Sequence, residues 1–458
     1  MEKQYDIGVL GLGVMGSALA KNMLDHDFNT ALFSVSEKER TDFYSENGLF
    51  HLCTTIEELI GCLKTPRKIF IMITAGKPVD SVINQLLPIL EKGDIIMDGG
   101  NSYYKDTKRR CEICERQGIH YLGVGVSGGE SGARNGPSVM VGGSKNGFKM
   151  VREILDTIAA QHDGIPCCTY IAENGAGHYV KMVHNGIEYA ILELLAESYH
   201  YMRFFAKMEP EEIRCIFLKW NNGRLNSYLI EISALVLGKK DEDGCLVLDK
   251  ILDIAEQKGT GAWTVSEGIE RGVYIPTIYE AQAARAFSKY KKERILGAEQ
   301  LACHPILEIK IEPDELEDAL LLAIIIAYSQ GLELIRHAAI AEGWDIDFAA
   351  LIAVWKEGCI IRSRLLEEIE LVKTLKESPL ILASEFSYVN RLEISLRKVA
   401  VSSVASGHAM PGFCSALNDY DSYRMKQMPV NFVQALRDCF GSHTYRRIDK
   451  EGYYHTSW

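Results

Sequence analysis

Residues 1–176 alternate between short apolar runs and longer amphipathic stretches. Apolar runs bounded by glycine or polar residues are typical of buried strands, and the stretches between them carry the helical period. The runs predict strands at 5–10, 30–35, 68–73, 94–98, 119–126, 138–143 and 167–171. Strands that alternate with helices in this way predict a doubly wound α/β domain over residues 1–176.

From residue 177 to about 435 the pattern is helical, which predicts a large all-α domain. A strongly apolar helix is expected near 315–341. Its longest apolar run, Ala319 to Tyr328, is too short to span a bilayer, so we expect a core helix and no membrane contact. So much apolar surface favours a homodimer. Residues 436–458 carry Tyr, His and Trp, and we expect this tail to dock on the partner subunit, with the chain's own surface as the alternative.

A glycine-rich turn joins the first predicted strand to a helix, and a second strand follows. This setting is the one that a dinucleotide-binding fingerprint requires, and it predicts a Rossmann-type domain. Gly11 permits the tight turn, Gly13 lets a pyrophosphate approach the backbone, and Gly16 lets helix and strand pack closely. Together with other strand-end positions, the candidate cofactor contacts are Gly11, Leu12, Gly13, Val14, Met15, Gly16, Ser34, Val35, Ser36, Ile73, Thr74, Ala75 and Asn101.

The helix predicted from Gly177 to Met202 carries an unusual polar group. Lys181, His184, Asn185 and Glu188 follow the spacing i, i+3, i+4 and i+7, which places them on one face. An exposed polar face is the simpler interpretation. Apolar residues nearly surround the helix, however, and a buried amine near a carboxylate suits acid/base chemistry, because burial shifts the pKa values of the two groups in opposite directions.

Composition narrows the class of protein. The net charge of −12 argues against a nucleic-acid partner. The N-terminus has no basic region and no cleavage site typical of a secretory signal, so the twelve cysteines are expected to be free thiols in a reducing cytoplasm. We expect no metal site, because the one Cys-x-x-Cys pair, at 111 and 114, has no second pair.

Several segments resemble decarboxylating 6-phosphogluconate dehydrogenases, in the right order and over nearly the whole chain. They are GLGVMG at 11–16, IMDGGNS at 96–102, GVSGGESGARNGPS at 125–138, GHYVKMVHNGIEY at 177–189, KWNNGRLNSYLIEI at 219–232, KGTGAWT at 258–264, GCIIRS at 358–363 and RDCFGSHTY at 437–445.

The resemblance implies oxidative decarboxylation of 6-phosphogluconate, a sugar acid phosphate, with NADP or NAD as the cofactor. Lys181 would be the base and then the acid at the C3 oxygen, and Glu188 would protonate C1 of the enediol. The resemblance also assigns substrate contacts to Asn101, Ser127, Gly128, Gly129, His184 and Asn185, and phosphate contacts to Tyr189, Thr264, Arg285, Arg437 and His443.

Four positions depart from the family pattern. Ala262 stands where a phosphate-binding Lys is usual, and Ser34-Val35-Ser36 replaces an Asn-Arg-Thr run whose Arg holds the 2′-phosphate of NADP. Thr74 stands in place of a common Lys, and Ser131 in place of the second Glu of a Gly-Gly-Glu-Glu run. Lys38 or Arg40 offers another phosphate contact, so NADP is favoured over NAD. Two alternatives stay open: a dehydrogenase for a different sugar acid, and a non-catalytic nucleotide-binding paralogue.

Overall fold

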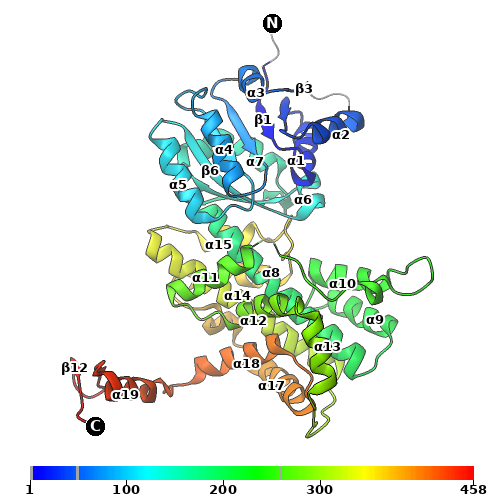
Figure 1. Ribbon diagram of the computed structural model, residues 1–458, viewed down its shortest axis with the longest axis vertical. Coiled ribbons are helices and arrows are strands. Elements are labelled where there is room, and N and C mark those ends of the chain that lie inside the picture. The colour runs from blue at the N-terminus through cyan, green and yellow to red at the C-terminus, as the bar shows by residue number, and fades with distance from the viewer. Residues whose placement is uncertain (1–3, 48–50, 258) are drawn as a thin grey trace.

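The computed structural model describes residues 4–47, 51–257 and 259–458 (Figure 1). Lys258, the first residue of the KGTGAWT segment, lies outside them. Eight strands form one sheet: β1 (Ile7–Leu10), β2 (Thr30–Phe33), β3 (His51–Leu52), β4 (Lys68–Ile71), β5 (Ile95–Asp98), β6 (His120–Ser127), β7 (Ser138–Gly143) and β10 (Cys168–Ala172).

The strands lie in the order β10-β7-β6-β5-β4-β1-β2-β3, and neighbouring strands are parallel except for β6 and β7. The segment from β3 to β6 has the order of a dinucleotide-binding sheet, which confirms the predicted fold class. Helices cover both faces: α1 (Val14–Asp25), α2 (Glu37–Asn47), α3 (Ile56–Cys62), α4 (Lys77–Leu86), α5 (Tyr104–Glu115), α6 (Gly129–Asn135) and α7 (Lys145–Ile158).

Two apolar layers hold this sheet between its helices. One joins Leu19 and Met23 of α1 and Val151 of α7 to one face, and the other joins Val79 and Ile83 of α4 to the opposite face. The predicted strands are confirmed, with ends shifted by a few residues. The apolar pattern predicted no element between β2 and β4, where the structure has α2, β3 and α3, because α2 is polar all round.

A second, helical part follows, as predicted. Its elements are α8 (Ala176–His200), a π-helix (Tyr201–Phe205), α9 (Pro210–Asn221), α10 (Tyr228–Gly238), α11 (Thr260–Arg271), α12 (Pro276–Ser288), α13 (Lys291–Gln300), α14 (Pro313–Glu342), α15 (Phe348–Ala353), α16 (Leu365–Glu370), α17 (Val389–Ser406), α18 (Pro411–Arg424) and α19 (Val430–Gly441). Short elements complete the chain: the hairpin β8 (Gln161–His162) and β9 (Ile165–Pro166), 3₁₀ turns at Val247–Lys250, Leu380–Leu382 and Ser384–Phe386, and the hairpin β11 (Tyr445–Arg446) and β12 (Tyr453–Tyr454).

α14 forms the centre of the helical part and packs against α8 and α17. By length and composition alone it could cross a membrane, but 89% of its apolar window is buried inside the protein. It is therefore a core helix, as its short uninterrupted apolar run predicts.

Candidate active site

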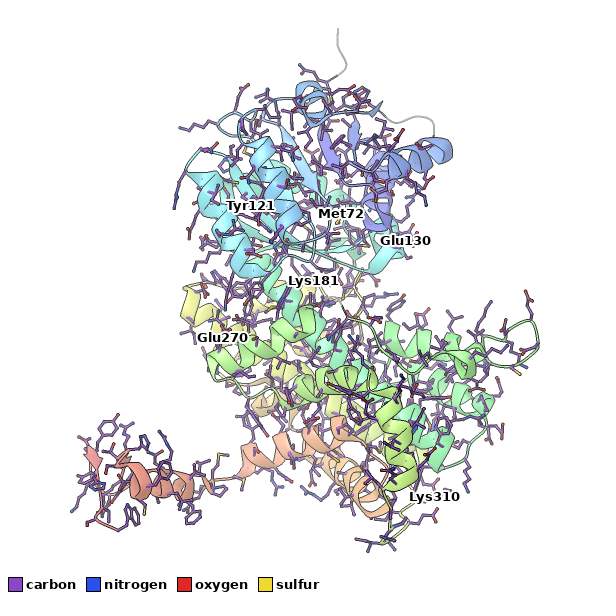
Figure 2. All side chains as sticks on the ribbon, in the orientation of Figure 1. Met72, Tyr121, Glu130, Lys181, Glu270 and Lys310 are labelled. Carbon is purple, nitrogen blue, oxygen red and sulfur yellow. The ribbon has the colours of Figure 1, made fainter. Side chains whose placement is uncertain are left out.

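α8 runs from the sheet into the helical part, and glycines bring it against the sheet. A Cβ at Gly177 would lie 2.4 Å from the Gly123 carbonyl oxygen of β6, and a Cβ at Gly125 would lie 2.6 Å from Cβ of Lys181. Only glycine permits such close approach of helix and strand. Lys181 is therefore fixed beside the carboxyl end of β6, at the junction of the two parts (Figure 2).

Lys181 is buried among neutral hydrogen-bond partners. Its Nζ donates to Oγ of Ser127 at 3.0 Å and to Oδ1 of Asn185 at 2.9 Å, and it lies 3.4 Å from Nδ1 of His184. No salt bridge of Lys181 occurs within the described residues. Burial lowers the pKa of Lys181, and the charge of Glu188 opposes this shift only in part. The amine can therefore give up its proton more readily than an exposed lysine.

His184 and Glu188 lie beside Lys181, and burial shifts the pKa values of the three groups in different directions. His184 is fully buried, its Nε2 lies 3.3 Å from Oγ of Ser127, and burial together with Lys181 holds its pKa well below the usual range, so the ring is neutral. Glu188 lies with Oε2 3.9 Å from Nδ1 of His184. Burial raises the pKa of Glu188, against the attraction of Lys181 and Arg285. One helix face thus presents a weakened base, a neutral donor and a weakened acid.

The loop after β6 forms the other wall of this group. Gly128 has φ 115° and Gly129 has φ 64°, a left-handed conformation that glycine adopts without strain. A Cβ at Gly128 would lie 2.4 Å from the carbonyl oxygen of Gly358, a residue that the sequence did not assign to the site. The segment before α16 therefore supports the loop that carries Ser127.

α11 contributes a residue that the sequence analysis missed. Thr260 accepts a hydrogen bond from Nδ2 of Asn185 at 3.2 Å, which fixes the amide so that its oxygen faces Lys181. Thr264, the residue proposed from the resemblance, is fully buried, and its hydroxyl contacts the carbonyl oxygens of Met182 and Thr260 at 2.9 and 3.0 Å. The sequence could have indicated Thr260, because it lies four residues before Thr264 and therefore on the same face of the helix.

Tyr189, the residue after Glu188 on α8, lies against Arg285 of α12. The Arg285 guanidinium sits 3.5 Å from the centre of the Tyr189 ring, and a Cβ at Gly261 would lie 2.6 Å from that ring. This stack brings a cation from α12 next to α8 and α11. Ala262, on the first turn of α11, is exposed and adds no charge there.

Arg437 and His443 lie away from this group within the single chain. α19 projects from the body at the end of an extended segment (Figure 1). The tail is nevertheless ordered around the buried Asp438, which accepts hydrogen bonds from the Thr444 amide at 2.9 Å, the Thr456 amide at 3.0 Å and the Trp458 indole at 2.9 Å.

The turn after β1 has the geometry expected for a nucleotide. Gly11 has φ 105°, and a Cβ there would lie 2.3 Å from the carbonyl oxygen of Met72; a Cβ at Gly16 would lie 2.0 Å from the Gly11 carbonyl oxygen. Gly13 caps α1 without a side chain, and the nearest atom to a Cβ there would be 3.8 Å away. The first-turn amides of α1 are thus accessible to an anion. The remaining positions of the turn are Leu12, Val14 and Met15.

The end of β2 combines a cation with hydroxyl groups. Arg40 donates to the carbonyl oxygen of Ser34, and Ser34 Oγ donates to Glu39 Oε2 at 2.6 Å. Ser36 Oγ accepts from the Glu39 amide at 3.2 Å, while Val35 is exposed. Of the two cations that the sequence left open, Arg40 is the one held at the end of this strand.

The loops after β4 and β5 lie side by side. A Cβ at Gly100 would lie 3.0 Å from the Ile73 carbonyl oxygen. The buried Asp98 organises the second loop by accepting from the Gly100 amide at 3.1 Å and from Ser102 Oγ at 2.7 Å. Asn101, between them, is exposed, as is Thr74 of the first loop, whereas Ala75 is half-buried.

Comparison with known proteins identifies the family of both parts of the chain. The model of the 6-phosphogluconate dehydrogenase C-terminal domain matches residues 177–458, and that of the NAD binding domain of 6-phosphogluconate dehydrogenase matches residues 6–172. The chain is 44% identical over its whole length to the NADP(+)-dependent, decarboxylating 6-phosphogluconate dehydrogenase of Bacillus subtilis, and all of that protein is covered.

Two further comparisons extend this similarity. The decarboxylating 6-phosphogluconate dehydrogenase of Staphylococcus aureus is 43% identical over 99% of this chain and 98% of its own length. A solved structure of 6-phosphogluconate dehydrogenase from Plasmodium falciparum, studied as the apo form and in complex with NADP+ and with 6-phosphogluconate, superposes with a TM-score of 0.95 at 40% identity, covering 99% of this chain and 100% of that one.

Proposed function

The chain belongs to the 6-phosphogluconate dehydrogenase family, and from this premise we propose how its residues carry out the reaction. It is an enzyme that decarboxylates 6-phosphogluconate oxidatively and uses NADP. The observation that carries the mechanism is the buried Lys181, which has neutral hydrogen-bond partners and a lowered pKa.

Lys181 acts first as a base and then as an acid. In its neutral form it accepts the proton of the C3 hydroxyl, and bound NADP would supply the acceptor for the hydride of C3. The new ammonium group then hydrogen-bonds the C3 ketone and stabilises the negative charge that develops on its oxygen as the C1–C2 bond of the β-keto acid breaks and C1 leaves as carbon dioxide. No metal ion is required for this step, because the ammonium supplies the positive charge.

Glu188 completes the reaction. Its raised pKa favours the protonated carboxyl, and it delivers that proton to C1 of the enediol, which gives ribulose 5-phosphate. Ser127, His184 and Asn185 hold Lys181 and the hydroxyl groups of the substrate, with Gly128, Gly129 and Asn101 beside them. Tyr189 and Arg285, which stack on each other, would bind the phosphate, and the buried Thr264 links α11 to α8.

The edge of the sheet beside α1 offers groups that suit the phosphates of NADP. The Gly11–Gly16 turn and the first turn of α1 offer backbone amides to the pyrophosphate, and Arg40 offers a guanidinium to the 2′-phosphate beside Ser34 and Ser36. Ile73, Thr74 and Ala75 border the same edge of the sheet.

The tail acts on a partner subunit in a cytoplasmic homodimer. Phe432 and Phe440 of α19 are 67% and 74% exposed, an apolar surface that a second subunit would cover. Arg437 and His443 would then reach the phosphate of the partner's substrate. Within one chain they lie away from Lys181 and Arg285.

The first test measures stoichiometry. NADPH and carbon dioxide should form in equal amounts from 6-phosphogluconate.

Lys181→Met should abolish turnover while NADP binding is retained, whereas Lys149→Met, at an exposed position on α7, should leave both unchanged. Turnover by Lys181→Met comparable to that of the unmodified enzyme would contradict the mechanism.

A second test concerns the tail. Lys181→Met subunits and Arg437→Ala subunits are each expected to be nearly inactive. A mixed dimer contains one site with both native residues, so random mixing should restore about a quarter of the native sites. No recovery in mixtures shown to exchange subunits would contradict the assignment of Arg437 to the partner's site.

A further inference from the structure

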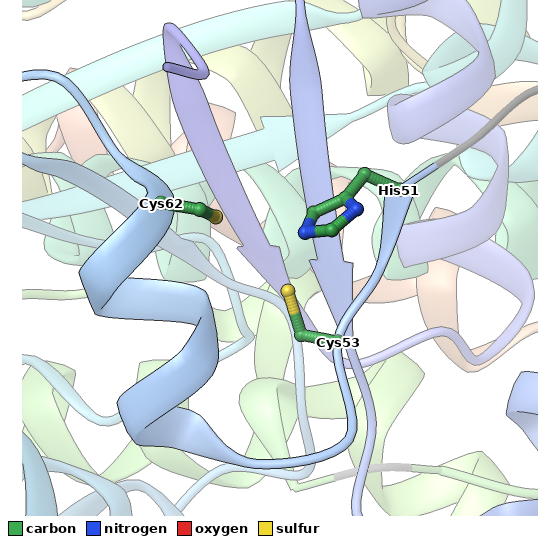
Figure 3. A group of neighbouring side chains, drawn as sticks. All are labelled: His51, Cys53 and Cys62. Carbon is green, nitrogen blue, oxygen red and sulfur yellow. The ribbon is translucent and has the colours of Figure 1, made fainter. Parts of the chain in front are cut away.

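Three metal-ligating side chains meet at the edge of the sheet, far from the catalytic helix. His51 lies on the edge strand β3, Cys53 follows that strand, and Cys62 ends α3. One imidazole nitrogen and the two sulfur atoms all lie within 4.8 Å of one another. Figure 3 shows the three side chains pointing toward a common space. The catalytic mechanism uses none of them.

The spacing and the donor set both suit zinc. Ligands that hold zinc tetrahedrally at 2.0–2.3 Å lie about 3.3–3.8 Å from one another, so rotamer adjustments of less than about 1 Å bring these three atoms into range. Two sulfurs and an imidazole are typical zinc ligands, while calcium and magnesium prefer oxygen.

The backbone holds each ligand in place. The Cys53 amide donates to the Leu32 carbonyl oxygen at 2.8 Å, and the Cys62 carbonyl oxygen accepts from the Tyr5 amide at 2.9 Å. The His51 ring stacks on Tyr5 with centroids 4.6 Å apart and planes 8° from parallel. β3 and the end of α3 are therefore fixed by β2 and by Tyr5, just before β1, before any ion binds.

The cluster is buried on one side and open to solvent on the other. Cys53 is fully buried, whereas His51 and Cys62 are half-buried, so the cluster can be reached from the surface. A divalent cation that enters the site displaces the thiol protons of Cys53 and Cys62.

We propose that His51, Cys53 and Cys62 bind one zinc(II) ion per chain, with water in the fourth position. Binding releases the two thiol protons to solvent, so that two thiolates balance the charge of the ion. The ion links the edge strand to α3 and stabilises the nucleotide-binding part of the protein. This proposal departs from the expectation of no metal site, which rested on Cys-x-x-Cys spacing.

Cobalt(II) titration of the reduced, metal-free full-length protein tests the site. The expected result is one equivalent of bound cobalt with visible d–d bands and near-ultraviolet sulfur-to-cobalt charge transfer, displaced by zinc. Cys53→Ser and Cys62→Ser should each weaken binding by at least about a hundredfold, and His51→Ala by at least about tenfold. Cys215→Ser, at an exposed cysteine of α9, is the matched control and should bind like the unmodified protein.

Zinc should also raise the melting temperature of the unmodified protein by about 2–6 °C but not that of Cys53→Ser. NADP-dependent activity verifies that each variant is folded. Absence of charge transfer would overturn the proposal, as would a spectrum unchanged in Cys53→Ser and Cys62→Ser. A Cys53–Cys62 disulfide in the protein purified without reductant, together with no cobalt binding after reduction, would overturn it too.

Discussion

Replacing Gly125 by alanine tests whether close packing of α8 on β6 positions Lys181, the proposed base. A Cβ at Gly125 would lie 2.6 Å from Cβ of Lys181, 3.2 Å from its Cγ and 3.0 Å from the Gly177 carbonyl oxygen. Carbon atoms in contact normally lie about 3.5–4.0 Å apart, so α8 must move away from the strand by about 1 Å.

Two effects of known size follow from this movement. Overpacking of this kind destabilises a protein by about 1–3 kcal/mol. A displacement of about 1 Å also misplaces Nζ of Lys181 relative to Ser127, and misplacement of that order lowers turnover about a hundredfold. The KM for NADP should stay within about twofold, because the Gly11–Gly16 turn is on β1, separated from β6 by β4 and β5.

Steady-state kinetics and thermal unfolding of Gly125→Ala measure both effects. Gly297→Ala is the matched control, because the nearest atom to a Cβ there, on the Leu301 side chain, is 3.8 Å away. The control should keep its kcat. The reasoning would be refuted if Gly125→Ala kept full kcat and melting temperature, or if both variants lost activity equally.

Three further predictions concern the nucleotide, the phosphate and the buried acid of α18. Arg40→Ala should raise the KM for NADP about tenfold or more and change that for NAD little, since a charge-assisted hydrogen bond contributes about 1.5–3 kcal/mol; equal changes for both cofactors would exclude a 2′-phosphate contact. Ala262→Lys should lower the KM for 6-phosphogluconate by about tenfold, the lower end of the range for a charge-assisted contact, because the position is exposed. An unchanged KM would show that this turn of α11 does not face the phosphate. Burial raises the pKa of Asp419 to about 7. Above about pH 4 the folded protein therefore holds a proton that the unfolded chain has released. The free energy of unfolding should fall by up to about 1.4 kcal/mol per pH unit as the pH rises toward 7. Asp419→Asn, followed by denaturant unfolding between pH 5 and 8, should remove that part of the slope, and an unchanged slope would assign it to other groups.

The sequence alone determined the features that depend on near neighbours in the chain. Apolar runs located the strands of the sheet, the glycine spacing at 11–16 located the nucleotide turn, and the i, i+3, i+4, i+7 spacing placed Lys181 and Glu188 on one helix face. These features follow from local geometry, because backbone period and glycine conformation act within a few residues.

The tertiary structure decided what depends on contacts between distant segments. Hydrophobic period could not show that Thr260 orients Asn185, or that Gly125 lies against Lys181, since each contact joins elements at least fifty residues apart. Nor could it show that His51 and Cys62 converge, because β3 is two residues long and α2 before it has no apolar stripe. The acid/base character of Lys181 likewise comes from burial, which lowers the pKa only after the sheet and the helical part close around the amine.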